Sequence, residues 1–274
     1  MSEDKKDTVI DGSNENSRES SREGTPERRR HRGIYLLPNL FTTGCLFAGF
    51  YAIVAAMGGR FESAAVAVFI AMILDGLDGR VARMTNTQSA FGAEYDSLAD
   101  MVSFGLAPAL VVYMWALSDL GKLGWLGAFI YTAATALRLA RFNTQVGRAD
   151  KRYFQGLASP AAAAVVAGMV WVGQDYQFEG LATSIFATLV TVCAGLLMVS
   201  NVRYRSFKDL DLKGKVPFVA ILAVVLLFVL ISLDPPQVLL AGFAVYAFSG
   251  PVGTLLSLRR RRAERRAQSS DQNE

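Results

Sequence analysis

The sequence has a single histidine, His31, and only two cysteines among its 274 residues. A Ser-His-Asp triad, a Cys-His pair and a metal site built from several histidines are therefore excluded. Cys45 and Cys193 lie far apart inside apolar runs, so they form neither a CxxC redox motif nor a CxxC zinc site. Charged residues are also scarce, at 19% of the chain, and many of them stand near its two ends.

Apolar residues dominate instead, with 52% of the chain hydrophobic and a mean hydropathy of +0.29. This composition excludes an ordinary soluble enzyme, a disordered chain and a disulfide scaffold. Because about 20 apolar residues cross a bilayer as a helix, the sequence predicts an all-α polytopic membrane helix bundle. The eight predicted transmembrane helices are 38–58, 62–84, 91–117, 123–143, 159–175, 181–200, 216–233 and 237–258.

The distribution of Lys and Arg predicts the orientation of this bundle. Every basic residue except Arg60 and Lys122 falls on one side of the predicted spans. The positive-inside rule then places both termini in the cytoplasm. We expect 1–32 to be a disordered polar cytoplasmic tail, 33–258 the transmembrane domain and 259–274 a basic cytoplasmic tail. Because the basic residues flank apolar spans, they indicate lipid headgroups as partners, and no nucleic acid.

Four aspartates interrupt the apolar pattern of the second and third predicted spans. Acidic residues inside a membrane helix are costly and usually functional, although ion pairs with arginines of the same span are an alternative. At about 100° per residue, Asp75 and Asp78 lie about 60° apart on one helix face. Asp96 and Asp100, four residues apart, share a face of the next helix. Since a short connector makes the two helices antiparallel, we expect all four carboxylates to converge near the cytoplasmic side.

Four carboxylates in a small space require cations to neutralise them. An all-oxygen set of ligands favours a hard cation, Mg²⁺ or Mn²⁺, over zinc. Two such ions about 4 Å apart would suit transfer at a phosphorus atom. A cation-coupled transporter is an alternative use of the same residues. Such transporters usually show two related halves or broken helices near the midplane, and the sequence shows neither.

Written out, residues 75–100 read Asp75-x2-Asp78-Gly79-x2-Ala82-Arg83-x8-Gly92-x3-Asp96-x3-Asp100. This pattern resembles the signature of the CDP-alcohol phosphatidyltransferase family at every fixed position and gap. Further stretches resemble the membrane-embedded branch of the family that uses serine; they are 96–105, 138–143, 154–161 and 200–208. The resemblance covers about residues 34–212, with one departure at Ala158, where that branch often has proline.

The resemblance implies a role for each of these residues. Asp75, Asp78 and Asp96 would bind the metal ions, and Asp100 would bind metal and act as the base for the acceptor hydroxyl. The residues implied to contact the CDP moiety are Gly79, Ala82, Arg83 and Gly92. In the serine branch, Arg138 and Arg141 are candidates for binding the acceptor's carboxylate or the transferred phosphate. An alternative for both arginines is snorkelling to lipid headgroups, and for both glycines it is close helix packing.

The implied reaction joins CDP-diacylglycerol and L-serine to give phosphatidylserine and CMP. We favour direct attack by the acceptor, with an Asp nucleophile left open, because no Cys or His is placed for a covalent intermediate. The 75–100 signature does not separate serine from glycerol phosphate, inositol phosphate or choline. The resemblance also implies a homodimer. The short bundle suits a bacterial inner membrane with the active site at its cytoplasmic side, where polar and lipid substrates meet.

Overall fold

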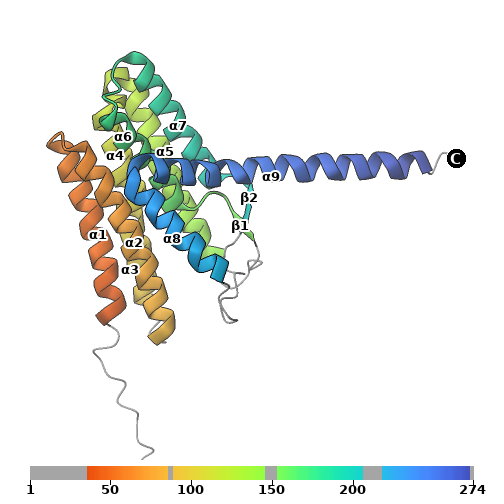
Figure 1. Cartoon of the computed structure of the whole chain (residues 1–274), viewed down its shortest axis with the longest axis horizontal. Helices are drawn as coiled ribbons and strands as arrows, with labels where there is room; N and C mark the ends of the chain where they lie inside the picture. The colour runs from red at the N-terminus through yellow and green to blue at the C-terminus, as the bar shows by residue number, and fades with distance from the viewer. Residues whose placement is uncertain (1–35, 86–88, 146–152, 206–217, 272–274) are drawn as a thin grey trace, which may run out of the picture. The chain divides into compact units, whose positions relative to one another are not determined.

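The computed structural model describes residues 36–85, 89–145, 153–205 and 218–271 as a nearly all-helical structure (Figure 1). The α-helices are α1 (Leu36–Met57), α2 (Phe61–Thr85), α3 (Ala90–Asp100), α4 (Ala107–Trp115), α5 (Lys122–Gln145), α6 (Ser159–Asp175), α7 (Leu181–Val199), α8 (Phe218–Leu233) and α9 (Pro235–Asp271). A π-helical segment, η2 (Met101–Leu106), joins α3 to α4, and a 3-10 turn, η3 (Leu117–Leu120), precedes α5.

All eight segments predicted to span the membrane are helical over most of the residues that the structure describes. Within the described residues, five helical stretches are long and apolar enough to cross a membrane: Pro38–Met57, Ala90–Trp115, Lys122–Thr144, Leu181–Val199 and Pro235–Leu256. The other three predicted spans are not long or apolar enough to be counted, for physical reasons. Helix α2 carries several charged side chains, whereas α6 and α8 have only 17 and 16 residues.

One short sheet corrects the all-α prediction. Strands β1 (Tyr153–Gln155) and β2 (Arg203–Arg205) pair antiparallel, with Phe154 opposite Tyr204. The pair joins the segment before α6 to the segment after α7. The tail predicted at residues 1–32 lies outside the described residues, and the stretch predicted as a basic tail is helical in α9 as far as Asp271.

Small side chains bring the helices close together around α6. This helix packs against α2, α4, α7 and α9 (Figure 1). Most of its buried positions are alanine, glycine or serine, including the alanine run 161–164. A side chain added at Gly168 would place its Cβ 3.3 Å from Cβ of Leu240 in α9, so this glycine permits the close contact. Membrane helices pack through small residues because lipid supplies no hydrophobic force between them.

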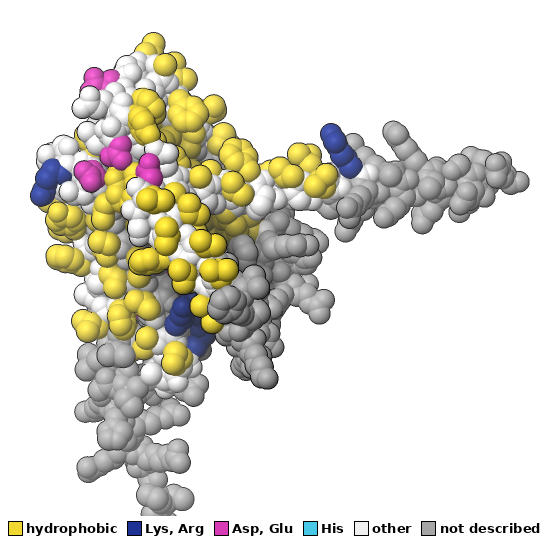
Figure 2. Space-filling model, in the orientation of Figure 1, with side chains coloured by type: hydrophobic (Ala, Val, Ile, Leu, Met, Phe, Trp, Pro, Cys, Tyr) yellow, Lys and Arg dark blue, Asp and Glu magenta, His cyan; other side chains and the backbone are white. Residues whose placement is uncertain are grey.

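Large apolar side chains cover much of the described surface, as Figure 2 shows. Phe47 is 70% exposed, Phe186 59% and Phe228 72%. A soluble protein rarely exposes apolar patches of this extent, because their contact with water is unfavourable. Together with the five long apolar helices, this surface indicates an integral membrane protein.

Replacing Gly124 by alanine is expected to lower the free energy of unfolding by about 2 kcal/mol. Gly124 is buried in the first turns of α5, and an added Cβ would overlap the carbonyl oxygen of Leu117 in η3. The backbone of η3 must then move away from α5. Thermal unfolding of the purified protein in detergent measures the effect.

The matched control is Gly242→Ala in α9, where an added Cβ meets no heavy atom within 4 Å. Because alanine favours a helix over glycine by about 1 kcal/mol, this variant is expected to keep its melting temperature or to raise it. Equal melting temperatures for the two variants would contradict the close contact between α5 and η3.

Candidate active site

The four aspartates predicted as a metal site come from two helices. Asp75 and Asp78 lie in the second half of α2, and Asp96 and Asp100 lie at the end of α3. One carboxylate oxygen from each of Asp75, Asp78 and Asp96 lies within 4.8 Å of the other two. Oxygens at this spacing can contact one divalent ion, since the metal–oxygen distances of such ions are about 2.0–2.6 Å. The structure therefore brings together three of the four predicted carboxylates in one group.

Asp100 stands next to this group rather than within it. It is the last residue of α3, and its carboxyl group is within hydrogen-bonding reach of Asp75. Its Oδ1 is buried and has no hydrogen-bond partner among the described residues. A buried polar atom without a partner is costly, so proteins keep one mainly where a ligand or ion completes the site.

Thr42 of α1 holds one of the carboxylates in place. Its hydroxyl donates a hydrogen bond of 2.9 Å to Oδ2 of Asp78, and both residues are buried. Such a partner fixes the orientation of a ligand carboxylate. Thr42 was not predicted as a site residue. The signal that could have found it is a polar side chain four residues after Pro38, near the predicted cytoplasmic end of an apolar span.

Two further contacts fasten α3 to its neighbours. Nδ2 of Asn143 in α5 donates to Oγ of Ser97 at 3.0 Å. The hydroxyls of Thr43 in α1 and Tyr95 in α3 lie 3.0 Å apart, with either group able to donate. Ser97 directly follows Asp96, so these bonds fix the helix that presents two of the aspartates.

The family model for CDP-alcohol phosphatidyltransferases matches residues 35–199, a range that contains all four aspartates. The chain belongs to the CDP-alcohol phosphatidyltransferase family. Two relatives from Helicobacter pylori, strains 26695 and J99, are 41% and 42% identical over 197 residues, which are 72% of this chain and 83% of each relative. A relative from Mycobacterium bovis is 38% identical over 186 residues, 65% of this chain and 64% of the relative. All three are named CDP-diacylglycerol–serine O-phosphatidyltransferase.

The other positions of the phosphatidyltransferase signature lie at the end of α2 and the start of α3. An added Cβ at Gly79 would meet no heavy atom within 4 Å, whereas one at Gly92 would lie 3.1 Å from Oγ of Ser89, the N-cap of α3. Nε of Arg83 donates to the carbonyl of Gly79 at 2.8 Å, and Ala82 is half-buried beside it. Gly79 therefore leaves open space beside α2, whereas the lack of a side chain at Gly92 makes room for Ser89, which caps α3. Their contact with CDP stays a prediction.

The two predicted arginines have different surroundings. Arg138 interacts electrostatically with Asp75 and Asp100, and its Nη1 donates to Oγ of Ser159 at 2.6 Å. Its Nε is buried without a hydrogen-bond partner among the described residues. Arg141 instead donates from Nη1 to the carbonyl of Val199, the last residue of α7, at 3.1 Å. The structure therefore places Arg138 beside the acidic site, and it gives Arg141 a bond to a helix end.

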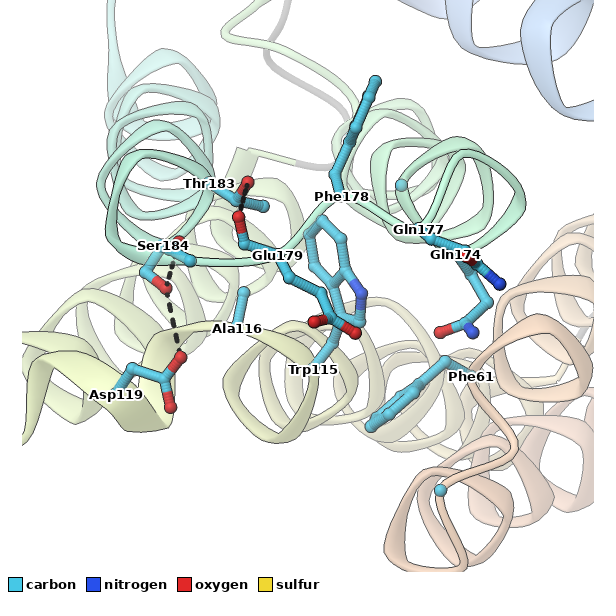
Figure 3. Close-up of a pocket in the computed structure, with 13 residues that line it drawn as sticks. Phe61, Trp115, Ala116, Asp119, Gln174, Gln177, Phe178, Glu179, Thr183 and Ser184 are labelled. Carbon is cyan, nitrogen blue, oxygen red and sulfur yellow. Dashed lines mark hydrogen bonds between the residues drawn. The ribbon is translucent and has the colours of Figure 1, made fainter.

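A separate cavity of about 540 Å³ lies far from the aspartates (Figure 3). It is lined by Phe61, the first residue of α2, whereas Asp75 lies about 21 Å further along that helix at roughly 1.5 Å per residue. Figure 3 shows Asp119 and Ser184 pointing toward each other in this cavity, where the hydroxyl donates to Oδ2 at 3.4 Å. None of the predicted site residues lines it.

Proposed function

We propose that this chain transfers the phosphatidyl group from CDP-diacylglycerol to the hydroxyl of L-serine, giving phosphatidylserine and CMP. The observation that carries the proposal is the group of carboxylate oxygens from Asp75, Asp78 and Asp96, within 4.8 Å of one another. The unpartnered oxygen of Asp100 lies beside this group. The choice of serine is supported by the relatives, which are named for that reaction.

The acidic site fits divalent metal ions. Asp75, Asp78, Asp96 and Asp100 would hold Mg²⁺ or Mn²⁺, because their donors are all carboxylate oxygens, and we propose two ions. The buried unpartnered Oδ1 of Asp100 is consistent with a site that a ligand completes. When bound, the metal would draw negative charge from the diphosphate and make CMP a better leaving group.

Asp100 is the proposed general base. A serine hydroxyl is a poor nucleophile at neutral pH, so a nearby group must accept its proton. Oδ1 of Asp100 has the free acceptor capacity for that proton. The serine oxygen then forms the new bond to the phosphorus next to diacylglycerol, while the bond from that phosphorus to the leaving CMP oxygen breaks. We propose this direct attack, with no covalent enzyme intermediate.

Arg138 is the proposed binding residue for the carboxylate of serine. Its guanidinium has an Nε–H without a partner and interacts electrostatically with Asp100, the proposed base. A guanidinium presents a rigid set of donors that matches a carboxylate or a phosphate. Serine bound there through its carboxylate would hold its hydroxyl near Asp100. Binding of the transferred phosphate is the alternative role of the same side chain.

The proposed topology has eight transmembrane helices and both termini in the cytoplasm of a bacterial cell, in the inner membrane. The acidic site would then lie at the cytoplasmic boundary. CDP and serine reach that boundary from water, whereas the diacylglycerol chains stay in the hydrocarbon layer and enter between helices. We also propose a homodimer. The distribution of Lys and Arg in the sequence supports the orientation.

An assay of acceptor alcohols tests the proposed reaction. The purified chain is incubated with CDP-diacylglycerol, Mn²⁺ and one labelled alcohol at a time: serine, glycerol phosphate, inositol phosphate or choline. We expect CMP release and labelled lipid with serine alone. Labelled lipid from another alcohol and none from serine would refute the choice of acceptor. Absence of CMP release with every alcohol, together with cation flux in vesicles, would support a transporter instead.

A further inference from the structure

The chain leaves the α-helical form directly after the proposed base. Residues Met101–Leu106 form the π-helical segment η2, and the N–H of Ala107 donates to the carbonyl of Val102, five residues earlier. π-Helical turns are rare and occur frequently at functional sites. A π-turn changes the direction in which the helix after it continues, so η2 sets how α3 and its Asp100 meet α4.

Pro108 leaves one carbonyl of this segment without its usual donor. Proline has no N–H, so residue 108 donates no backbone hydrogen bond to the preceding turn. Phe104 is fully buried, so water is excluded from its carbonyl group. The hydroxyl of Tyr131 in α5 donates to the carbonyl of Phe104 at 2.9 Å, and Tyr131 is itself fully buried. A side chain from another helix therefore supplies a hydrogen-bond donor to a buried carbonyl of η2.

A second helix fastens η2 from the other side. Oγ of Ser103 donates to the carbonyl of Cys45 in α1 at 2.9 Å. An added Cβ at Gly49 would lie 2.7 Å from Cα of Ser103, so α1 touches the backbone of η2 at this point. The segment that follows Asp100 is therefore held by α5 through Tyr131 and by α1 through Ser103.

We propose that Tyr131 is a positioning residue of the acidic site: its hydroxyl keeps η2 in the π-helical form, and η2 aims the carboxylate of Asp100 at the other aspartates. This inference rests on the proposed function. Tyr131 donates its proton to a backbone carbonyl and acts on the site only through that bond. Without the hydroxyl, the buried carbonyl of Phe104 loses the bond that ties η2 to α5, and η2 is free to shift. Such a shift moves Asp100 away from the metal ligands.

A pair of tyrosine variants tests the proposal. Tyr204 resembles Tyr131 in two respects: it is 1% exposed, and its hydroxyl donates to a backbone carbonyl, that of Ala247, at 2.9 Å. That bond joins β2 to α9 instead of holding η2. Tyr131→Phe and Tyr204→Phe therefore remove the same kind of buried hydrogen bond. The readouts are binding of Mn²⁺ to the full chain in detergent, followed by electron paramagnetic resonance, and CMP formation as a function of Mn²⁺ concentration.

We expect both variants to lower the melting temperature by similar amounts. Only Tyr131→Phe is expected to weaken Mn²⁺ binding, by about tenfold, as loss of a group that orients a metal ligand does. Its half-saturating Mn²⁺ concentration in the assay should rise by the same factor. An equal loss of Mn²⁺ affinity in both variants, or no loss in Tyr131→Phe, would overturn the proposal.

Ser103→Ala serves if Tyr131→Phe does not fold, because it releases η2 from α1 and leaves the hydrogen bond of Tyr131 in place. Weaker Mn²⁺ binding in this variant supports the positioning role of η2, and unchanged Mn²⁺ binding overturns it.

The wild-type chain distinguishes failure of the proposed function from failure of the proposed role of Tyr131. If it binds Mn²⁺ but forms no phosphatidylserine, the proposed function fails. If it forms phosphatidylserine and Tyr131→Phe matches it in Mn²⁺ affinity, only the role of Tyr131 fails.

Discussion

Replacing Asp100 by asparagine is expected to lower the rate of CMP formation with serine by about 10³-fold, the range attributed to a positioned general base. Asparagine keeps the size of the side chain and loses the charge and the proton acceptor. The buried Oδ1 of Asp100, without a partner among the described residues, is the atom whose role this variant removes. The rate is measured as CMP release at saturating CDP-diacylglycerol, serine and Mn²⁺.

The matched control is Asp119→Asn. Asp119 is an aspartate too. It accepts a hydrogen bond from Ser184, and it lines the separate cavity of Figure 3. This control variant is expected to keep the wild-type rate. Raising the Mn²⁺ concentration separates two roles of Asp100: a residue that only binds metal is rescued by excess ion, and a base is not. A rate for Asp100→Asn close to that of Asp119→Asn would remove Asp100 from the mechanism.

Removal of divalent metal is expected to stop the reaction. Metal at a reacting phosphate supplies several kcal/mol of charge stabilisation, so chelation should lower the rate by about 10³-fold or more. Adding Mn²⁺ or Mg²⁺ back is expected to restore it. Carboxylate oxygens from Asp75, Asp78 and Asp96 within 4.8 Å of one another repel without a cation. The melting temperature should therefore also rise with Mn²⁺ concentration.

Two variants that replace a carboxylate by a carboxamide test whether the metal dependence arises at the acidic site. Asp96→Asn removes one member of the three-oxygen group and is expected to raise the half-saturating Mn²⁺ concentration. Glu179→Gln, in the separate cavity, removes one carboxylate from the chain without touching that group and should leave the value unchanged. Full activity after exhaustive chelation would show that the aspartates do not act through a divalent ion.

The positions of the helices could be predicted from the sequence, because runs of apolar residues are a local signal. The strands β1 and β2 could not, since each has three residues and exists only through pairing with a segment far along the chain. The eight predicted spans are helical over most of their described residues, and five of the described stretches meet the length and hydropathy needed to cross a membrane. The charges of α2 and the length of α6 explain part of that difference.

In the candidate site, too, local features could be predicted from the sequence and contacts between distant residues could not. Helix periodicity within α2 and within α3 placed each pair of aspartates on one face, and the structure groups Asp75, Asp78 and Asp96. The spacing of Arg138 and Arg141 in the sequence did not predict that they would have different surroundings. They stand three positions apart in α5, but Arg138 interacts electrostatically with Asp100, whereas Arg141 donates to the carbonyl of Val199 at the end of α7.

The sequence by itself determined the membrane helices, the faces of the aspartates and the family signature, because each of these is a pattern within one continuous stretch of the chain. Only the tertiary structure decided how the site is held. Thr42 reaches Asp78 from another helix, and Tyr131 of α5 donates to the buried carbonyl of Phe104 in η2. Such bonds join groups 27 or more residues apart, so they arise from the packing of whole helices, which no local pattern encodes.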